Sequence, residues 1–491
     1  MRIAIALAIA FALLAAIVLI KTALVASFQL DVAPVRTIDI EREQAVERLS
    51  RVIRFNTVSY QDRERVDPAE LLRLHEYLER AFPRVHATLE REIVGDYSLL
   101  YKWQGTSPNL KPILLMGHMD VVPVEPGTES DWTHPPFAGE VTDGFIWGRG
   151  TLDMKQTIMA YLEAVEWLLE DSFQPQRTVY LALHHDEEVG GRNGALKMAR
   201  LLKSRGVQLE FTLDEGSAIT HGIVPGVQRP VALVALAEKG YLTVELTATG
   251  DGGHSSKPPP NTAVGKLSRA IHRLETNQMP ADLRPPASRI FAYLAAEMPF
   301  LMRMVVANRW LFEPLLLSRL EGKPATNAII RTTTAPTILR RAGVKENVLA
   351  TEAQALVNFR LLPGDTIDRV VDHVRTTIDD VDVTIRELGH PREASPVSDI
   401  DAPSFVALHE AIRQVFPDVV VAPSLVIGGT DSKHYVAVAD NSYRFLPIRL
   451  ASEDLKRIHG TDERIAVVDY IESIRFYVQL LGNVAAAQGS E

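Results

Sequence analysis

Cysteine is absent from the 491 residues of this chain. Its absence excludes disulfide bonds, thiolate zinc sites, a cysteine nucleophile and a lipid-modified cysteine anchor. Any bound metal must therefore be held by histidine, aspartate and glutamate side chains. An excess of positive charge is missing too, because the formal net charge is −10 at pH 7. Without a basic stripe that carries interleaved aromatic residues, we expect no nucleic-acid partner.

Several catalytic sequence patterns are also missing. The chain has no GxSxG elbow, which disfavours a serine hydrolase. His75-Glu76 and His409-Glu410 both lack the second histidine of an HExxH zinc motif. Internal repeats and low-complexity tracts are absent. The composition, 46% apolar and 23% charged, is that of an ordinary globular protein, and the length suffices for two to three domains.

One long apolar run stands at the N-terminus. Residues 3–20 are uninterrupted apolar residues behind Arg2, and Lys21 and a second apolar run follow. This length reaches the lower limit for a membrane-spanning helix and slightly exceeds the core of a signal peptide. We expect residues 1–30 to form an uncleaved signal anchor with the body outside the cytoplasm. The alternatives are a signal peptide cleaved near Ala26-Ser27, which would leave a secreted or periplasmic body, and a buried soluble helix.

Three consecutive acids, Asp186, Glu187 and Glu188, follow the β-type run 178–183. Three adjacent carboxylates repel one another, and their pKa values rise unless a cation lies among them. A divalent metal fits this position, because it can take one carboxylate as a ligand and leave a neighbour free as a base. A solvated acidic turn is the alternative reading of the triplet alone.

Other predicted strands also end in polar residues. In the strand 112–124, His118 and Asp120 project to one face, so that Asp120 could fix the tautomer of a metal-binding His118. Asp153 opens an apolar helix, as an N-cap or as a carboxylate between two cations. The strand 209–213 ends in Asp214.

Strands that end in polar residues and lead into helices are typical of an α/β domain, whose sites form at the carboxyl ends of the strands. We therefore expect His118, Asp153, Glu187, Glu188 and Asp214 to converge there. These acids exceed what one metal requires, which favours two metal ions. Of the adjacent His184 and His185, which face opposite sides of a strand, we assign neither as a ligand.

The pattern changes after residue 236. Residues 239–250 alternate as in a half-exposed antiparallel strand and lead into a glycine-rich loop that carries His254. A helix at 261–274 and strands at 327–339, 352–361 and 381–388 complete a small α+β unit. We place this unit at residues 237–395, inserted between two parts of a catalytic domain at 40–236 and 396–487.

Two further stretches suggest contacts with a ligand or a partner. The apolar strand 419–427 ends in glycines, and Gly429 and Thr430 there could present amide hydrogens to a carboxylate. Residues 290–320 are unusually apolar. They suit a core helix or a dimer interface, or alternatively a surface that binds acyl chains or touches a membrane.

Taken together, the motifs resemble the M20 family of metallopeptidases, most closely its carboxypeptidase S branch. That branch includes secreted or membrane-anchored carboxypeptidases and N-fatty-acyl-amino-acid synthase/hydrolases. The resemblance runs in family order from about residue 45 to the C-terminus. The matching stretches are GHMDVVPV, GRGTLDMK, HHDEEVGG, LDEG, GGHSSKP, NFRLLPGDT, GGTDSKHY and HGTDERI. It implies an α/β fold in which helices sandwich a zinc-peptidase-like mixed sheet, with an inserted smaller α+β lid and dimerisation domain.

The resemblance also implies a ligand set for two Zn²⁺ ions per chain. One zinc would be held by His118 and Asp214 and the other by Glu188 and His459, with Asp153 between them.

For catalysis, the resemblance implies that Glu187 is the general base and that Asp120 orients His118. His254, Asn327 and Arg360 match positions that contact substrate from the smaller domain. In the family that domain also mediates homodimers, and His254 can act in the partner's site.

The expected activity is that of a zinc amidohydrolase acting on a small molecule or short peptide with a free carboxylate. It would release a C-terminal amino acid from a peptide or from an N-acyl amino acid, and the sequence does not fix the direction of the reaction. The apolar stretch 290–320 favours fatty-acyl substrates. An aminoacylase for short acyl groups is an alternative, and a catalytically silent, membrane-anchored binding module is an alternative of another class.

Overall fold

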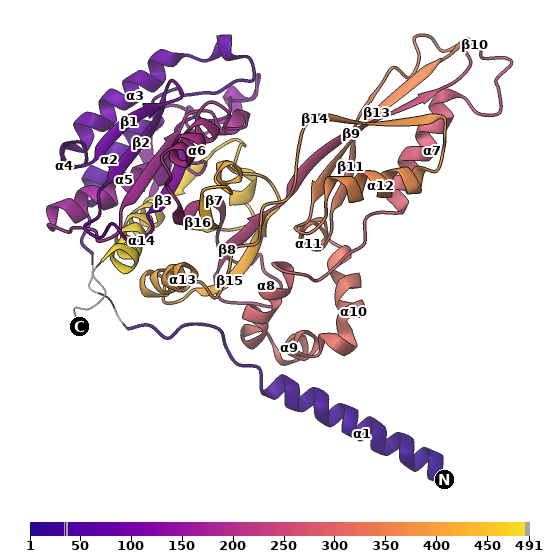
Figure 1. Ribbon diagram of the computed structural model, residues 1–491, viewed down its shortest axis with the longest axis horizontal. Helices are drawn as coiled ribbons and strands as arrows, with labels where there is room; N and C mark the ends of the chain where they lie inside the picture. Colours follow the sequence, from indigo (N-terminus) through magenta and orange to yellow (C-terminus); the bar gives the residue numbers. More distant parts are fainter. Residues whose placement is uncertain (34, 36–37, 487–491) are drawn as a thin grey trace.

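The buried apolar runs of the sequence lie side by side in one eight-stranded sheet (Figure 1). The computed structural model describes residues 1–33, 35 and 38–486. In spatial order the strands are β1 (Glu90–Val94), β2 (Ser98–Trp103), β6 (Val179–His184), β3 (Ile113–His118), β7 (Leu209–Thr220), β16 (Ala439–Leu450), β8 (Val231–Glu238) and β15 (Val420–Val426). β6, β3, β7 and β16 are mutually parallel, whereas β2 is antiparallel to β6, so the sheet is mixed.

Helices cover both faces of this larger sheet, because its strands are apolar on both sides. One face carries α2 (Arg42–Ile53), α3 (Pro68–Ala81), α4 (Pro83–Thr88), α5 (Lys155–Glu170), α13 (Pro403–Val415) and α14 (Val467–Ala485). α6 (Ala195–Ser204) packs on the other face. Alternate residues of β3 divide between these two cores: Leu115 belongs to the first and Leu114 to the second. The predicted α/β class, a mixed sheet sandwiched by helices, is confirmed.

A smaller unit extends from the larger one where β8 passes into β9 (Figure 1). Its antiparallel sheet has the order β11 (Thr333–Arg340), β13 (Glu352–Leu361), β9 (Gly240–Thr249) and β14 (Val383–Arg392). α7 (Ala263–Thr276) and α12 (Ile367–Ile378) pack on it and share its apolar core. β10 (Gly253–His254) pairs with β12 (Val348–Leu349) at the end of the unit that is distant from the larger sheet. The predicted domain boundaries stay predictions, and residue 487 lies outside the described residues.

Two predicted strands differ from the structure. The stretch 327–339 is not one strand, because α11 (Pro324–Ile330) precedes β11, and the fixed φ of Pro324 suits the first turn of a helix. Asn327 therefore lies on a helix. β7 does not stop at Leu213 but continues to Thr220, so that Asp214 and Glu215 are both strand residues. Adjacent strand residues face opposite sides.

The apolar stretch 290–320 forms α8 (Ala287–Leu294), α9 (Phe300–Ala307) and α10 (Arg309–Glu321). Ile290 and Leu294 of α8 join the core of the larger unit, and α8 packs against β15. This part of the predicted insertion thus contacts the catalytic body. In contrast, α9 and α10 expose several large apolar side chains, including Phe300, Leu301 and Leu315.

The N-terminal run forms the helix α1 (Arg2–Ala23), which projects away from the rest of the chain (Figure 1). Its best 18-residue window has a mean hydropathy of 3.2, and only 6% of that window is buried. By length and composition α1 could cross a membrane, and a signal sequence would have the same properties.

The remaining short strands join the C-terminal segment to the loop before α5. β5 (Phe145–Trp147) pairs with β4 (Val141–Thr142) on one side and with β17 (Arg464–Ala466) on the other. This small sheet brings residues 459–463 next to residues 149–153, although more than 300 positions separate them in the sequence.

Candidate active site

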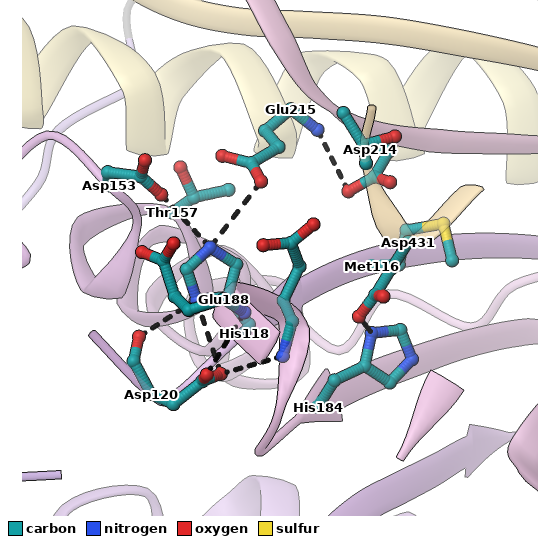
Figure 2. A network of polar contacts seen from close by, with 12 residues as sticks. Met116, His118, Asp120, Asp153, Thr157, His184, Glu188, Asp214, Glu215 and Asp431 are labelled. Atoms are coloured by element: carbon teal, nitrogen blue, oxygen red, sulfur yellow. Dashed lines mark hydrogen bonds and ion pairs between the residues drawn. The ribbon is translucent and has the colours of Figure 1, made fainter. Parts of the chain in front are cut away.

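Two histidines face the two oxygens of a single carboxylate. His118 Nε2 lies 3.0 Å from Asp153 Oδ1, and His459 Nε2 lies 3.0 Å from Asp153 Oδ2. Glu188 Oε2 is 3.2 Å from His459 Nε2, and Glu215 Oε1 is 3.4 Å from His118 Nε2. Figure 2 shows the Asp153 and Glu215 side chains directed at the imidazole of His118. The structure thus brings together four of the five predicted metal ligands.

The topology explains this convergence. β6, β3 and β7 are adjacent and parallel, and the carboxyl ends of parallel strands meet at one edge of a sheet. His118 is the last residue of β3, and Glu187 and Glu188 form a short 3₁₀ turn shortly after β6. Asp153 precedes α5, and His459 comes from the loop before β17.

A buried glutamate fixes the segment that carries Asp153. Glu463 Oε1 accepts hydrogen bonds from the backbone N–H groups of Gly150, Leu152 and Asp153 at 2.8–3.2 Å. Its second oxygen pairs with the buried Arg149 at 2.7 Å. Arg149 also donates to the backbone carbonyl of His459. Glu463 therefore couples the position of Asp153 to that of His459.

Asp120 holds both the imidazole and the acidic turn. His118 Nδ1 is 2.8 Å from the backbone oxygen of Asp120 and 3.5 Å from its carboxylate, so Nδ1 carries the proton and Nε2 is free for a ligand. The Asp120 carboxylate accepts from the backbone N–H groups of Glu187 and Glu188 at 3.2 Å each. In contrast, Asp186 accepts from Asn193 and Gly194 and points away from the cluster.

Asp214 lies outside the cluster, and its neighbour Glu215 lies inside. The Asp214 carboxylate accepts from the backbone N–H groups of Ser432 and Glu215 at 2.8 and 2.9 Å (Figure 2). Glu215 is the residue whose carboxylate approaches His118. The pair occupies consecutive positions of β7, so only one of the two can face the histidine. The resemblance assigned Asp214 of the LDEG motif as the ligand, whereas in the structure its neighbour Glu215 approaches His118.

The buried acids of the cluster would be stabilised by a bound cation. Burial, reinforced by the negative charge of Asp153, raises the pKa of Glu215 to about 8. Burial also raises the pKa of Glu187 and of Glu188. Glu188 Oε1 is buried and finds no hydrogen-bond partner among the described residues.

The donor atoms are of the right kind for such a cation. The donors of His118, Glu187 and Glu215 lie within 4.8 Å of one another, and so do those of His118, Asp153 and Glu188. Imidazole nitrogens together with carboxylate oxygens are donors that Zn²⁺ accepts. The residues present therefore fit a metal centre.

A group of buried polar residues from β6 and the GGTDSKHY stretch lies next to the cluster. Asp431 Oδ2 is 2.8 Å from His184 Nδ1, whose other nitrogen is 2.9 Å from the hydroxyl of Tyr435. Both ring nitrogens of His184 thus face other side chains, and His184 is not part of the clustered donors around His118. Lys433 Nζ lies 3.8 Å from Glu187 Oε1 and 3.8 Å from Asp431 Oδ1. Sequence reasoning gave Asp431 and Lys433 no role, although both belong to the GGTDSKHY stretch.

The four predicted substrate-binding residues gather where the two units join. Lys239, between β8 and β9, donates to the backbone oxygen of Ala328 beside Asn327, and Asn327 Oδ1 is buried without a partner among the described residues. Arg360 lies over the ring of Tyr241 at 4.8 Å. Thr430 donates its N–H to Glu238 at 2.8 Å, and Gly429 adjoins Arg392.

His254 does not lie near the cluster. It is exposed on β10, beyond the distal end of β9 (Figure 1). A strand of this length spans about 33 Å at roughly 3.3 Å per residue. Within one chain, as the structure describes it, His254 cannot contact a substrate held at Asp153.

The sequence is similar to those of known proteins. Residues 114–483 match the model of the peptidase family M20/M25/M40. The chain is 42% identical over 449 residues to "Probable carboxypeptidase S-like 2" of Dictyostelium discoideum, covering 91% of this chain and 85% of that protein. It is 43% identical over 448 residues to the N-fatty-acyl-amino acid synthase/hydrolase PM20D1 of Xenopus tropicalis, covering 90% and 86%.

Solved structures show the same fold. The M20 family metallo-carboxypeptidase Sso-CP2 from Sulfolobus solfataricus superimposes with a TM-score of 0.63 at 18% identity, covering 90% of this chain and 99% of that one.

The raised pKa values predict how the stability of the metal-free protein depends on pH. Folded Glu215 keeps its proton to about pH 8, whereas an ordinary glutamic acid loses it near 4.5. Between these values the folded state binds more protons than the unfolded state, so stability falls as pH rises. His459, whose pKa is raised to about 10 by Asp153 and Glu188, acts in the same direction above 6.5.

We therefore expect metal-free wild-type protein to lose stability relative to Glu215→Gln between pH 5 and 8. Urea titrations of both proteins, with substitution of the exposed Glu453 as a control, would measure the difference. Parallel curves for wild type and Glu215→Gln would contradict the raised pKa of Glu215.

Proposed function

Because the chain belongs to the peptidase family M20/M25/M40, it is a hydrolytic enzyme of that type, and we propose that it cleaves the amide bond to a C-terminal amino acid with two zinc ions. The observation that carries this proposal is the carboxylate of Asp153, whose two oxygens each face one histidine. The relatives named above support two substrate classes. N-fatty-acyl amino acids come first, given 43% identity to an enzyme named for them, and peptides come second.

The chain offers two zinc sites that share Asp153. His118 and Glu215 would hold one ion, and His459 and Glu188 the other. We prefer Glu215 to Asp214 as the ligand, because the Asp214 carboxylate is already bonded to two backbone N–H groups. When bound, the zinc ions would lower the pKa of a water molecule and polarise the amide carbonyl.

Glu187 is placed to move the proton. Its backbone is held by Asp120, its side chain is 12% exposed, and its carboxylate lies within 4.8 Å of donor atoms of His118 and Glu215. It would take a proton from the attacking water and pass it to the leaving nitrogen. Lys433, 3.8 Å away, would favour the charged form that accepts the proton.

The join between the units would bind the free carboxylate of the substrate. Arg360 offers a planar fork of donors that matches a carboxylate. The unpartnered oxygen of Asn327 can accept an N–H from the scissile amide, and the backbone at Gly429 permits close approach. Glu238 balances the local positive charge, since Arg392 pairs with it at 2.8 Å.

His254 would act in the site of a second chain. It lies too far from its own cluster, and its loop is exposed at the tip of the smaller unit. A homodimer formed through the smaller units could present each His254 to the partner's site, where it would stabilise the developing oxyanion. We further propose that α1 anchors the protein in a membrane with its body outside the cytoplasm. Cleavage of α1 as a signal peptide would release the body.

Zinc content distinguishes the ligands. Glu215→Gln should lower bound zinc from two to about one per chain, because it removes a ligand that approaches His118. Asp214→Asn, its neighbour on β7, should retain both ions. Metal analysis after dialysis would measure this. Loss of zinc only in Asp214→Asn would reverse the assignment, and a wild type that binds fewer than two ions without chelator-sensitive turnover would indicate a silent binding module.

Glu187→Gln should keep both zinc ions yet lower kcat by about 10²–10⁴-fold, because it removes the general base. Turnover of N-acyl amino acids with short and long acyl chains and of dipeptides would measure this and rank the substrate classes. A preference confined to short acyl groups would favour an aminoacylase. Normal turnover in Glu187→Gln would exclude Glu187 as the base.

The same variant supplies a test of the dimer. His254→Ala should also be nearly inactive. Co-refolding it in equal amounts with Glu187→Gln should restore about one quarter of wild-type activity, since half of the dimers would contain one intact site of two. Failure to restore activity would place His254 in its own chain's site or outside catalysis.

Arg360→Ala should raise KM for substrates with a free carboxylate by about 10–100-fold and change kcat little, because it removes a charge-assisted hydrogen bond. Carboxamide analogues should be unaffected. Arg386→Ala, in the same sheet but paired with Glu245, is the matched control. An equal effect on carboxamides would contradict carboxylate binding by Arg360.

A further inference from the structure

α9 and α10 leave several large apolar side chains exposed, although the last turns of α1 contact part of their surface. Leu301 is 70% exposed, and Phe300, Trp310 and Leu315 are each at least half exposed. These helices lie at the end of the molecule from which α1 departs (Figure 1). We call this surface, formed by Phe300, Leu301, Trp310 and Leu315, the α9–α10 face. Large exposed apolar side chains on two neighbouring helices are typical of an interaction site.

The last turns of α1 contact residues at and beside this face. Asn308, between α9 and α10, is fully buried, and its amide donates to the backbone oxygen of Val18 and to the hydroxyl of Thr22 at 3.2 Å each. Lys21 Nζ lies 5.5 Å from the ring centre of Trp310. Among the residues of α1, Val18 and Thr22 are the two buried ones.

The segment after α1 is fixed to the catalytic body as well. The side chain of Gln29 makes two hydrogen bonds, of 2.8 and 2.7 Å, with the backbone of Val421 on the edge strand β15. Phe28 stacks on Tyr293 of α8 with ring centres 4.8 Å apart. Because the last turns of α1 and the segment that follows them are both held by contacts with the body, α1 leaves the body in a defined direction.

The length of α1 determines how deep its contact with the α9–α10 face would lie in a bilayer. Its 22 residues span about 33 Å at 1.5 Å per residue, close to the roughly 30 Å of a bilayer's hydrocarbon core. If α1 crosses a membrane, residues 18–22 lie at the boundary between hydrocarbon and headgroups. Side chains that contact them lie at the same depth. Tryptophan and lysine are typical of that level.

We propose that the α9–α10 face is seated in the headgroup and upper acyl region of the same lipid bilayer that α1 spans. This rests on the membrane anchor proposed above and extends it to a second, interfacial contact. A spanning α1 together with the interfacial α9–α10 face would fix the orientation of the body relative to the membrane, whereas α1 alone would leave the body free to rotate. α10 also leads directly to α11, which carries Asn327, so the surface lies next to the substrate-binding side of the smaller unit.

Tryptophan fluorescence tests this directly, because Trp310 is the one tryptophan of five that is mostly exposed. The full chain would be reconstituted into phosphatidylcholine and phosphatidylglycerol vesicles whose acyl chains carry bromine near the headgroups. Bromine quenches only tryptophans within the bilayer. We expect a quenched component in wild type that disappears in Trp310→Phe and persists in Trp167→Phe, which alters the half-buried tryptophan of α5.

A second variant separates membrane seating from folding. Leu301→Gln combined with Leu315→Gln should reduce the quenching of Trp310 by about half or more, because it removes apolar area from the interface. Hydrolysis of a soluble dipeptide should be unchanged, since neither leucine belongs to the active site.

The outcomes distinguish the anchor from the surface. Retention of the chain in vesicles after alkaline carbonate washing reports the anchor, and quenching of Trp310 reports the α9–α10 face. Retention with equal quenching in wild type and Trp310→Phe would overturn the proposal. So would shielding of Trp310 from both bromolipid and aqueous acrylamide, which would indicate a second copy of the chain on this face. Release of an intact, active chain by carbonate would refute the anchor and this inference together, and would leave the hydrolytic function standing.

Discussion

The structure depends on a cluster of buried carboxylates whose mutual repulsion must be relieved by a bound cation or by protonation. Asp153, Glu187, Glu188 and Glu215 lie within a few ångströms of two imidazoles, and no more than 16% of any of these acidic side chains is exposed. Unpaired charge in such surroundings costs several kcal/mol per group. A fold that gathers these acids is therefore strained without metal and stabilised with it, so metal binding and folding are linked.

The surrounding hydrogen bonds show how the chain maintains this arrangement. Several members of the cluster are positioned by two buried acids whose oxygens are bonded to backbone N–H groups. Asp120 fixes His118 and the turn of Glu187, while Glu463 fixes the segment of Asp153 through three backbone N–H groups. Both acids have other hydrogen-bond partners, which makes them poor ligands and good supports. Outer residues of this kind orient the first ligands of metal sites and tune their basicity.

The sequence predicted most of the convergence, because it follows from topology. Parallel strands that end in His118 and in the turn of Glu187 must meet at one edge, whatever the details of packing. What it could not decide was orientation within a strand. Asp214 and Glu215 are adjacent acids, and the face that each occupies depends on where β7 pairs with β3 and β16. The helix at Asn327 was missed for a related reason, since a short turn after Pro324 leaves too few residues to show a helical period. Glu463 belongs to the HGTDERI stretch, but its supporting role could not be predicted, because that role consists of contacts with residues more than 300 positions away.

The helices of the apolar stretch 290–320 have two different physical roles, although their sequences are similarly apolar. Its first helix is ordinary core, because Ile290 and Leu294 complete the larger unit beside β15. Its later helices keep comparable apolar residues at the surface, where they add nothing to that core. Exposure of this kind destabilises a chain in water unless another phase or partner covers it. Asn308 provides the link between the two roles, because a fully buried amide that bonds to α1 would lose two acceptors if α1 were removed. A surface that needs α1 to satisfy its own buried polar group is structurally tied to α1. Under the proposed anchoring, the catalytic body would therefore be held against the membrane at a fixed orientation.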